Sequence, residues 1–305
     1  MNIVNHRTVY FWITGLILAA AIGAIAVFGL PLSIDFTGGS LIQVQYSNGR
    51  PALSTIQTEA ATVPVGAVSV RASGSDAIAI RTRTLTPAEH DALLTALSQN
   101  ASTTELAYTS VGPALGSQFA HKALWAIIAV VLAIILYIAF AFRRVSRPVS
   151  SWSYGLTVIA ILVHDLIIPA GFFAILAHFT GAQADTLFVT ALLALLGYSV
   201  NDTIIIFDRV REHLATNEKT GLKETFEETV GKSITETLTR SINTSLTVIL
   251  ALLALAILGA SATRDFALVM LVGVIAGTYS SILLAAPLLV PLAHRALNKQ
   301  QPKKK

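Results

Sequence analysis

The chain has 305 residues, of which 54% are hydrophobic and 12% are charged, with no cysteine and a formal charge of +4. A typical soluble domain has about 25% charged residues, so much of this chain cannot face water; soluble globular and disordered proteins are excluded. The lack of cysteine excludes disulfides, thiol catalysis and thiolate metal sites. Basic residues gather in short runs beside apolar segments, which is typical of membrane orientation and argues against a nucleic-acid partner.

Six apolar stretches are long enough to cross a hydrocarbon core about 30 Å thick, which takes about 20 helical residues. They are residues 9–30, 120–142, 152–176, 185–207, 239–260 and 266–292. The first spans 22 residues. Because a signal-peptide core has about 7 to 15, we expect a retained anchor, with a cleaved signal as the alternative.

The distribution of Lys and Arg predicts the orientation, because cytoplasmic loops carry the excess of both. Most lie in four segments that fall on one side of the membrane: residues 1–8, 143–151, 208–238 and 293–305. The opposite short turns, 177–184 and 261–265, hold only Arg264. Both termini are therefore predicted to be cytoplasmic.

Residues 31–119 form an extracytoplasmic segment long enough for a small domain. Apolar residues that alternate with polar ones predict a strand at 42–46, and shorter pairs predict strands at 68–70, 78–80 and 106–108. Ser54 with Gln57, and Thr86 with Glu89, have the spacing of capping boxes that begin helices. The order βαββαβ predicts an α+β ferredoxin-like domain.

The cytoplasmic segment 208–238 carries an apolar residue at every fourth position of its second half. These residues are Leu222, Phe226, Val230, Ile234 and Leu238. The spacing predicts a helix that lies along the membrane surface, with a partner-docking helix as the alternative. Asp208 and Arg209 are expected to anchor the end of the preceding helix.

Asp202 is the most informative charge in the predicted spans. It lies seven residues before Arg209, which is about 10 Å along a helix. Because a charge at the bilayer centre costs about 2.5 to 3.5 kcal/mol or more, intramembrane carboxylates generally mark ion or proton routes. We predict that Asp202 titrates a proton; a permanent pair that pins two helices is the alternative. Tyr198 and Asn201 add polar groups nearby, and only Tyr198 shares its helical face.

His164 and Asp165 lie near the middle of the third span. Adjacent helical positions point about 100° apart, so we expect at most one of them on a proton route. Asp165 is either a relay or a packing residue, and His164 is expected to be a hydrogen-bonded helix contact.

Arg240, Asn243, Thr244 and Thr247 form a polar stripe at the start of the fifth span. Such a stripe must line protein or water. Arg240 is predicted to pair with ionised Asp202 and to release it on protonation, with a snorkelling arginine at the interface as the alternative.

Gly273 and Gly277 have the spacing that permits close helix packing. The sequence has no Gly-rich phosphate loop, no His pair at metal spacing and no Gly-x-Ser-x-Gly elbow. We therefore predict no nucleotide hydrolysis or other enzyme activity and no cofactor. A proton crossing the membrane yields about 2.3 kcal/mol per 100 mV, so protons are the expected coupling ion.

Several of these residues stand in recognisable motifs. The motifs are Asp35-Phe36-Thr37-Gly38-Gly39, His164-Asp165, the runs 197–203 and 207–212, and Arg240-Ser241-Ile242-Asn243-Thr244-Ser245. Together they resemble the SecF family of the bacterial SecD/SecF protein-export complex, over nearly the whole chain. The first motif alone is shared with SecD.

The resemblance implies an RND-like bundle of six transmembrane helices in the bacterial inner membrane. It implies a SecD partner, association with the SecYEG channel, and YajC and YidC as accessory partners. It also implies that proton flow helps to complete the export of preproteins after the ATP-driven motor has acted. The family's intramembrane aspartate and arginine fall on Asp202 and Arg240.

Two other functions compete with this one. A small-molecule exporter of RND type usually has about twelve crossings and two large exported domains, whereas here one segment of residues 31–119 is too small for a drug pocket and exit duct. A passive scaffold that stabilises a channel would not depend on the charge of Asp202.

Overall fold

The computed structural model describes residues 2–99, 101–142 and 151–300. Its contacts divide the chain into two units. The helical unit comprises residues 1–30, 126–182 and 187–305, and the sheet unit comprises residues 31–125 and 183–186. Most of the predicted turn at 143–151 and the last five residues of the predicted basic tail, 301–305, lie outside the described residues.

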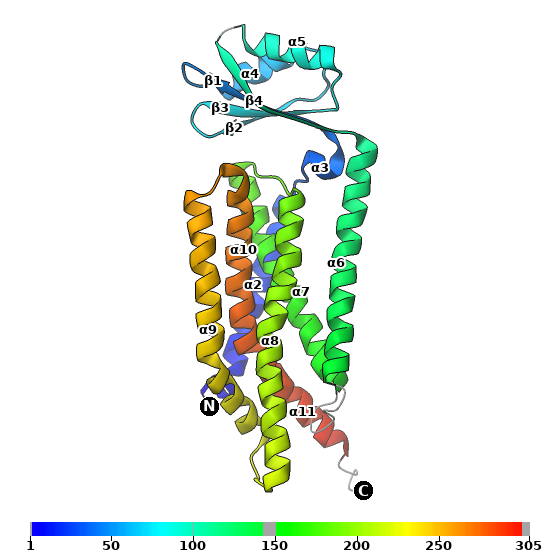
Figure 1. Ribbon diagram of the computed structural model, residues 1–305, viewed down its shortest axis with the longest axis vertical. Coiled ribbons are helices and arrows are strands. Elements are labelled where there is room, and N and C mark those ends of the chain that lie inside the picture. The colour runs from blue at the N-terminus through cyan, green and yellow to red at the C-terminus, as the bar shows by residue number, and fades with distance from the viewer. Residues whose placement is uncertain (1, 100, 143–150, 301–305) are drawn as a thin grey trace. The chain divides into compact units, whose positions relative to one another are not determined.

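The sheet unit has the predicted order of strands and helices. Its elements are α3 (Ile34–Thr37), β1 (Gly39–Tyr46), α4 (Leu53–Ala60), β2 (Ser69–Ser73), β3 (Ala77–Thr82), α5 (Pro87–Leu97) and β4 (Thr103–Val111). The four strands pair antiparallel in the order β2-β3-β1-β4, and α4 and α5 cover one face of the sheet (Figure 1). This arrangement agrees with the predicted ferredoxin-like domain.

Alternation along the strands decides which face is covered. Ile42 and Val44 of β1 and Ile80 of β3 are fully buried and pack against Ile56 of α4 and Leu93 of α5. The residues between them point to the opposite face, which has no helix from α4 or α5 on it, because successive side chains of a strand alternate. The hydrophobic core of the sheet unit therefore lies between the sheet and its two helices.

One of the two predicted helix starts is correct. Thr86 and Glu89 form the predicted capping box at the start of α5. The capping box predicted at Ser54 is wrong, because α4 begins one residue before Ser54 with Ala52 as its N-cap and no side-chain cap. The side chain of Gln57 instead donates a hydrogen bond to the carbonyl of Val68, which links α4 to the segment before β2.

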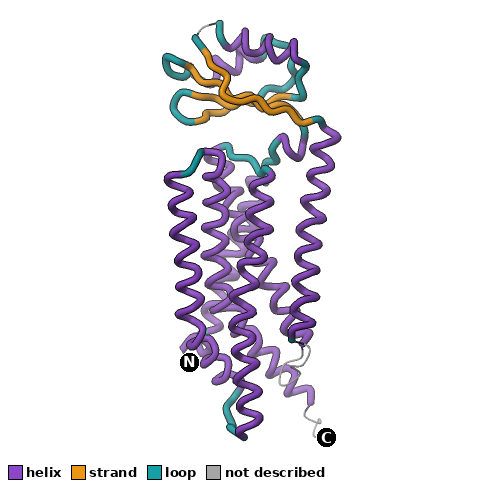
Figure 2. The backbone as a smooth tube through the Cα atoms, viewed as in Figure 1, coloured by secondary structure: helices purple, strands orange, loops and turns teal. Residues whose placement is uncertain are grey.

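The helical unit contains nearly all of the predicted spans. Its elements are α1 (Asn2–Asn5), α2 (Arg7–Phe28), α6 (Pro113–Ala141, which starts in the sheet unit), α7 (Ser151–Thr180), α8 (Thr186–Thr220), α9 (Phe226–Leu258), α10 (Ser261–Ser280), the π-helix η1 (Ser281–Ala285) and α11 (Ala286–Gln300). In the described part of the chain, six helices are long and apolar enough to cross a membrane, as predicted. Figure 2 shows these helices in purple. They are α2, α6, α7, α8, α9 and the continuous run from α10 to α11.

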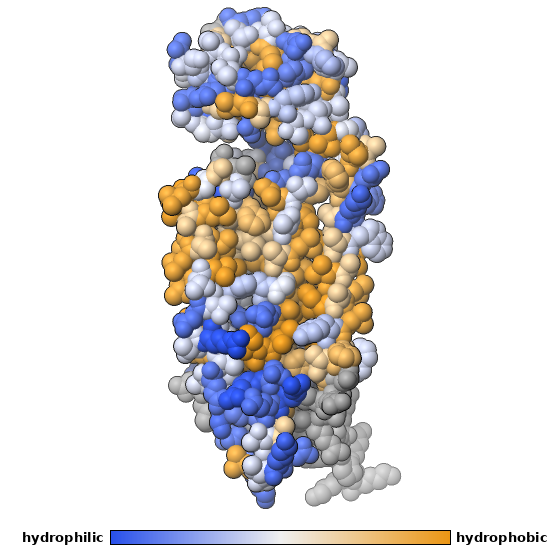
Figure 3. All heavy atoms as spheres, in the orientation of Figure 1, coloured by the Kyte–Doolittle hydropathy of each residue, from blue (hydrophilic) through white to orange (hydrophobic). Residues whose placement is uncertain are grey.

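The surface of these helices is apolar where lipid would contact it. Large hydrophobic side chains are exposed along α6 and α9, among them Leu136, Phe140, Leu250 and Leu258, and they form a broad hydrophobic belt (Figure 3). Only 6% of the apolar window of α6 is buried, against 61% for α7. The helix α7 therefore lies at the centre of the unit, and α6 lies at its edge.

The predicted surface helix over 222–238 is wrong. The helix α8 continues to Thr220 and ends at Gly221, whose φ of +67° favours glycine. After a short loop, the capping box of Thr225 and Glu228 begins α9. Val230 and Ile234 of the apolar stripe are buried in the core of the helical unit, so this stripe packs inside the protein.

Candidate functional site

Asp202 lies inside the helical unit with an oxygen that has no hydrogen-bond partner. The residue is 2% exposed on α8. Within the described part of the chain, its Oδ2 atom accepts no hydrogen bond, and the buried hydroxyl of Ser241 on α9 is likewise unpaired. Ser241, Ser245 and Arg240, all on α9, are the side chains that act on the Asp202 carboxyl. A buried carboxyl in this state is inexpensive to protonate and costly to ionise.

Tyr198, one helical turn before Asp202, belongs to a chain of hydroxyl groups. It precedes Asp202 by one turn of α8, on the same face, and its hydroxyl donates to the Oγ atom of Ser245 at 3.0 Å. Thr278 of α10 donates to the same oxygen at 2.7 Å. Hydroxyl groups can donate and accept, so this chain can reverse its direction without moving heavy atoms.

The polar stripe that begins at Arg240 faces away from the interior. Arg240, Asn243, Thr244 and Thr247 are all exposed in the chain as described, and so is Asn201 of α8. Arg240 attracts the Asp202 carboxylate through space, but no ion pair joins these two described residues. The pairing of the two therefore stays a prediction.

The buried face of α9 carries small hydroxyl residues instead. They recur at every fourth position and are Ser233, Thr237, Ser241 and Ser245. The spacing by four was present in the sequence and could have identified this face. Small side chains let neighbouring helices approach closely.

Asp165 is the centre of a second buried network. Its Oδ1 atom lies 2.7 Å from Nδ1 of His164. Its Oδ2 atom accepts hydrogen bonds from Ser280 of α10, at 3.0 Å, and from Ser199 of α8. The hydroxyl of Tyr279 lies 2.7 Å from Nε2 of His164. Both Asp165 and His164 are thus parts of one network, because the carboxyl turns back to meet the neighbouring ring. That at most one of them lies on a proton route stays a prediction.

Four consecutive residues of the last span join these networks, and the sequence analysis did not single them out. They are Thr278, Tyr279, Ser280 and Ser281, and each one forms a side-chain hydrogen bond to another helix. Ser281 bonds to Thr203 of α8 at 2.9 Å and is the first residue of the π-helix η1. Single π-helical turns often occur at functional sites. The signal in the sequence was a run of hydroxyl side chains inside an apolar segment.

Gly273 and Gly277 pack α10 against α8, as predicted. A Cβ atom at Gly273 would collide with the side chain of Leu195, and one at Gly277 would lie 3.2 Å from Cβ of Ser199. Ser199 also donates to Asp165. The close approach of the two helices therefore helps to hold the Asp165 network together.

The motif that follows the first span, residues 35–39, contacts the first residue of α8. Asp35 accepts hydrogen bonds from the backbone nitrogen of Thr186 at 3.1 Å and from its hydroxyl at 3.3 Å, so the carboxylate lies at the first residue of α8. A negative charge is favourable at a helix N-terminus. Phe36, the next residue of the motif, is buried.

The two glycines of the motif have structural reasons. Gly38 has φ +72°, and a Cβ atom there would lie 2.7 Å from Cα of Pro113. Gly39 has φ +127°, and its Cβ would lie 2.5 Å from the carbonyl oxygen of Thr82. From the other side, a Cβ at Gly116 of α6 would lie 2.6 Å from the nitrogen of Gly38. The motif is a tight junction between α3, β3 and the start of α6.

Comparisons with known proteins fit this architecture. Residues 91–295 match the family described as "Protein export membrane protein SecD/SecF, C-terminal", and residues 23–49 match the "SecD/SecF GG Motif". The chain therefore belongs to the SecD/SecF family of protein-export membrane proteins.

Curated relatives specify the subunit. The "Protein translocase subunit SecF" of Thermobaculum terrenum is 39% identical over 302 residues, which cover 95% of this chain and 93% of the relative. The subunit of the same name from Anaerolinea thermophila is 37% identical over 293 residues, with 95% and 93% covered. The chain therefore belongs to the SecF family of protein translocase subunits.

Solved structures agree with this assignment. The crystal structure of SecDF from Thermus thermophilus, "a translocon-associated membrane protein", matches with a TM-score of 0.83 and 31% identity. The match covers 97% of this chain and 39% of that chain. A second SecDF structure, in a "Super-membrane-facing form", has a TM-score of 0.69 at 30% identity, with 98% and 40% covered. This chain thus spans about two fifths of SecDF. The names of the relatives support a translocase subunit over a small-molecule exporter.

Proposed function

We propose that this chain acts with SecD to use the proton motive force in completing the export of preproteins through the SecYEG channel. In this proposal the protein lies in the bacterial inner membrane with both termini in the cytoplasm, and YajC and YidC are accessory partners. It hydrolyses no nucleotide and binds no cofactor, because protons supply the energy. The observation that carries the proposal is the buried Asp202 carboxyl with an unpartnered oxygen.

The physical argument rests on the cost of that carboxyl in its two states. An ionised carboxylate without a partner is expensive in a low-dielectric interior, whereas the neutral acid is not. The ionised form of Asp202 is stabilised when the cation of Arg240 approaches it, and protonation of Asp202 releases that cation again. One proton carried across the membrane supplies about 2.3 kcal/mol per 100 mV, enough to bias a conformational equilibrium.

The second network supports a route for the conformational change. Ser199, which donates to Asp165, lies on α8 three residues before Asp202, and Tyr198 lies beside it. The same run of α10 that donates to Asp165 through Ser280 also reaches the Tyr198 chain through Thr278. A shift of α8 or α10 on protonation would therefore rearrange both networks together. In this role Asp165 acts as the relay.

The exposed polar residues favour a partner within the membrane. Asn201, Arg240, Asn243 and Thr244 are exposed on spans whose other exposed side chains are mostly apolar. Polar side chains of membrane helices face protein or water. SecD is the partner that would cover them, because the matched structures are of SecDF.

The test is the variant Asp202→Asn in membrane vesicles that contain SecD and SecYEG. We expect it to fold and assemble, and to lose the increase in export that an imposed proton gradient gives, while ATP-driven export remains. The matched control is Asp208→Asn, an exposed carboxylate on the same helix that pairs with Arg211. Gradient-stimulated export at the wild-type rate in Asp202→Asn would leave only a passive scaffold.

A further inference from the structure

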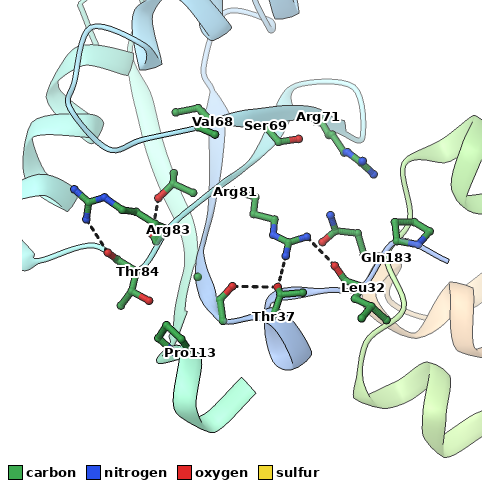
Figure 4. Close-up of a pocket in the computed structure, with 15 residues that line it drawn as sticks. Leu32, Thr37, Val68, Ser69, Arg71, Arg81, Arg83, Thr84, Pro113 and Gln183 are labelled. Carbon is green, nitrogen blue, oxygen red and sulfur yellow. Dashed lines mark hydrogen bonds between the residues drawn. The ribbon is translucent and has the colours of Figure 1, made fainter. Parts of the chain in front are cut away.

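The sheet unit has a pocket on the sheet face opposite α4 and α5. Its volume is about 700 Å³, and it lies beside the end of β3 and the SecD/SecF GG motif (Figure 4). Residues of β2 and β3 form one wall, and Leu32, Thr37, Pro113 and Gln183 are among those that form the rest. All of the lining residues belong to the sheet unit.

Two arginines of neighbouring strands share this pocket. Arg71 of β2 pairs with Ala79 of β3, and Arg81 follows Ala79 by two residues, so both arginines lie on the same face of the sheet. The pKa of Arg81 is lowered, first by its partial burial and then by the positive charge of Arg71. The two cations therefore repel each other, and an anion between them would relieve that repulsion.

Arg81 is held in position by neutral acceptors. Its Nη1 atom donates to the carbonyl of Leu32 at 2.7 Å, and its Nη2 atom donates to the hydroxyl of Thr37. A guanidinium has five N–H donors, so others stay available to a ligand. Arg83 is different: it points away from these groups in Figure 4 and forms an ion pair with Glu89. Arg71 and Arg81 are the two arginines that line the pocket from the same face of β2 and β3.

Chain connectivity limits the distance between the pocket and the membrane-spanning helices. Leu32 follows the last residue of α2, Phe28, by four positions, and Gln183 follows the last residue of α7, Thr180, by three. Since an extended chain advances at most about 3.6 Å per residue, Leu32 lies within about 14 Å of the end of a membrane-spanning helix. Pro113 is itself the first residue of the span α6. These lining residues are therefore within reach of the phospholipid headgroups.

We propose that this pocket binds the phosphate group of an anionic phospholipid, with Arg71 and Arg81 as its cationic contacts. Arginine is suited to phosphate because its planar fork donates two parallel hydrogen bonds. Leu32, which is 44% exposed, gives the rim an apolar side chain that can contact the glycerol and upper acyl chain. An acidic peptide would offer the same charge without using this apolar rim or this reach to the headgroups.

The experiment uses the full chain purified with SecD, and it measures affinity for phosphatidylglycerol, phosphatidylcholine and inorganic phosphate by native mass spectrometry. One arginine at a membrane surface contributes about fivefold in affinity for anionic lipid. We expect Arg71→Gln to weaken phosphatidylglycerol binding by about that factor and to leave phosphatidylcholine binding unchanged. Arg71→Gln is preferred to a change at Arg81, which also holds Leu32 and Thr37 in place.

The matched control is Arg50→Gln, which removes one arginine from the sheet unit outside the pocket and also loses hydrogen bonds to backbone carbonyls. Equal effects of Arg71→Gln and Arg50→Gln would overturn the proposal. So would inorganic phosphate binding as tightly as the lipid, which would make the pocket a site for free anions. Tighter binding of a synthetic acidic peptide than of phosphatidylglycerol would overturn it as well.

Discussion

The two buried aspartates of the helical unit differ in what surrounds them. Asp165 accepts hydrogen bonds on both carboxyl oxygens, from His164, Ser199 and Ser280. Asp202 is buried to the same degree, and its Oδ2 atom has no partner among the described residues. A carboxylate with hydrogen bonds on both oxygens stabilises the fold. A buried carboxyl with an unpaired oxygen destabilises it, and a functional step can relieve that destabilisation.

This difference predicts that removing the charge of Asp165 lowers the free energy of unfolding and that removing the charge of Asp202 does not. Asp165→Asn puts an NH2 group in place of one of the two carboxyl oxygens, where it faces either the ring of His164 or the hydroxyls of Ser199 and Ser280, so we expect the free energy of unfolding to fall by about 1 to 2 kcal/mol. Asp202→Asn removes a carboxyl whose Oδ2 atom has no hydrogen-bond partner among the described residues, and we expect no loss of stability. Thermal unfolding of both variants in the same detergent is the measurement. A loss at Asp202→Asn as large as at Asp165→Asn would contradict the distinction.

Glu89 of the sheet unit predicts a dependence of stability on pH. Hydrogen bonds from Arg83, then from the backbone and hydroxyl of Thr86, lower the pKa of Glu89 to about 2. The unfolded chain has a pKa of about 4.3 for this group. Because the folded pKa is the lower one, the stabilisation is fully present above about pH 5 and is lost as the pH falls towards 2.

The comparison with Glu89→Gln isolates this contribution from those of other carboxylates. We expect wild type to melt at a higher temperature than Glu89→Gln at pH 6, and we expect the difference to shrink as the pH is lowered to 3. Calorimetry of the two full-length chains across this range is the measurement. A difference that does not change with pH would show that the carboxylate bonds contribute nothing in the folded state.

At the scale of elements, the SecD/SecF GG motif sets the path of the chain from α3 into β1. Gly38→Ala must adopt φ +72° and push its Cβ into Pro113. A non-glycine residue at φ +72° and ψ 168° costs about 1 to 3 kcal/mol, and the collision adds to that. Gly74→Ala has a similar φ of +74° with nothing near its Cβ, so it serves as the control for the backbone cost alone.

We expect Gly38→Ala to lower the opening free energy of β1 by at least about 1 kcal/mol more than Gly74→Ala does. Amide hydrogen exchange of β1 and β3 in the full chain measures that free energy. Equal losses in the two variants would mean that the junction can move aside, and that the packing of Gly38 against α6 is not a constraint.

Elements with a strong local signal were predictable from the sequence, and the directions of side chains were not. The six spans follow from length and hydropathy, and the strands of the sheet follow from alternation, since both depend on neighbouring residues alone. The stripe at Arg240 was found correctly as a stripe. Which face of α9 points inwards depends on how α9 is rotated against α8 and α10. The small hydroxyl residues around Ser241 occupy the inward face, but the sequence pattern of α9 alone does not favour that face over the one that carries Arg240.

The same reason explains the two networks. The bond from Ser199 to Asp165 joins residues on different helices, and so does the bond from Tyr279 to His164. No spacing within one helix predicts them. The contact between the adjacent residues His164 and Asp165 was not predicted either, because the 100° spacing describes where side chains leave the helix and not where their ends can reach.

At the scale of the whole molecule, the helical unit has an apolar outer surface interrupted by the exposed polar side chains of α9. Leu246 and Leu250 of α9 are exposed as lipid-facing residues are, whereas Asn243 and Thr244 are exposed and polar. Polar groups left against lipid lose hydrogen bonds that no solvent replaces. We therefore expect a second membrane subunit, SecD, to cover this part of α9.

This predicts a change along α9 when SecD is present. The chain has no cysteine, so Asn243→Cys gives a single attachment point for a nitroxide spin label. We expect the label to be mobile and accessible to oxygen in the chain alone, and to become immobile and shielded when SecD is co-expressed. Leu132→Cys on α6, which is 53% exposed, is the control, and its label should stay accessible to oxygen in both samples. If the label at residue 243 keeps its mobility in the SecD complex, the polar stripe does not face SecD. Arg240 would then have to act on Asp202 without SecD packed against the stripe.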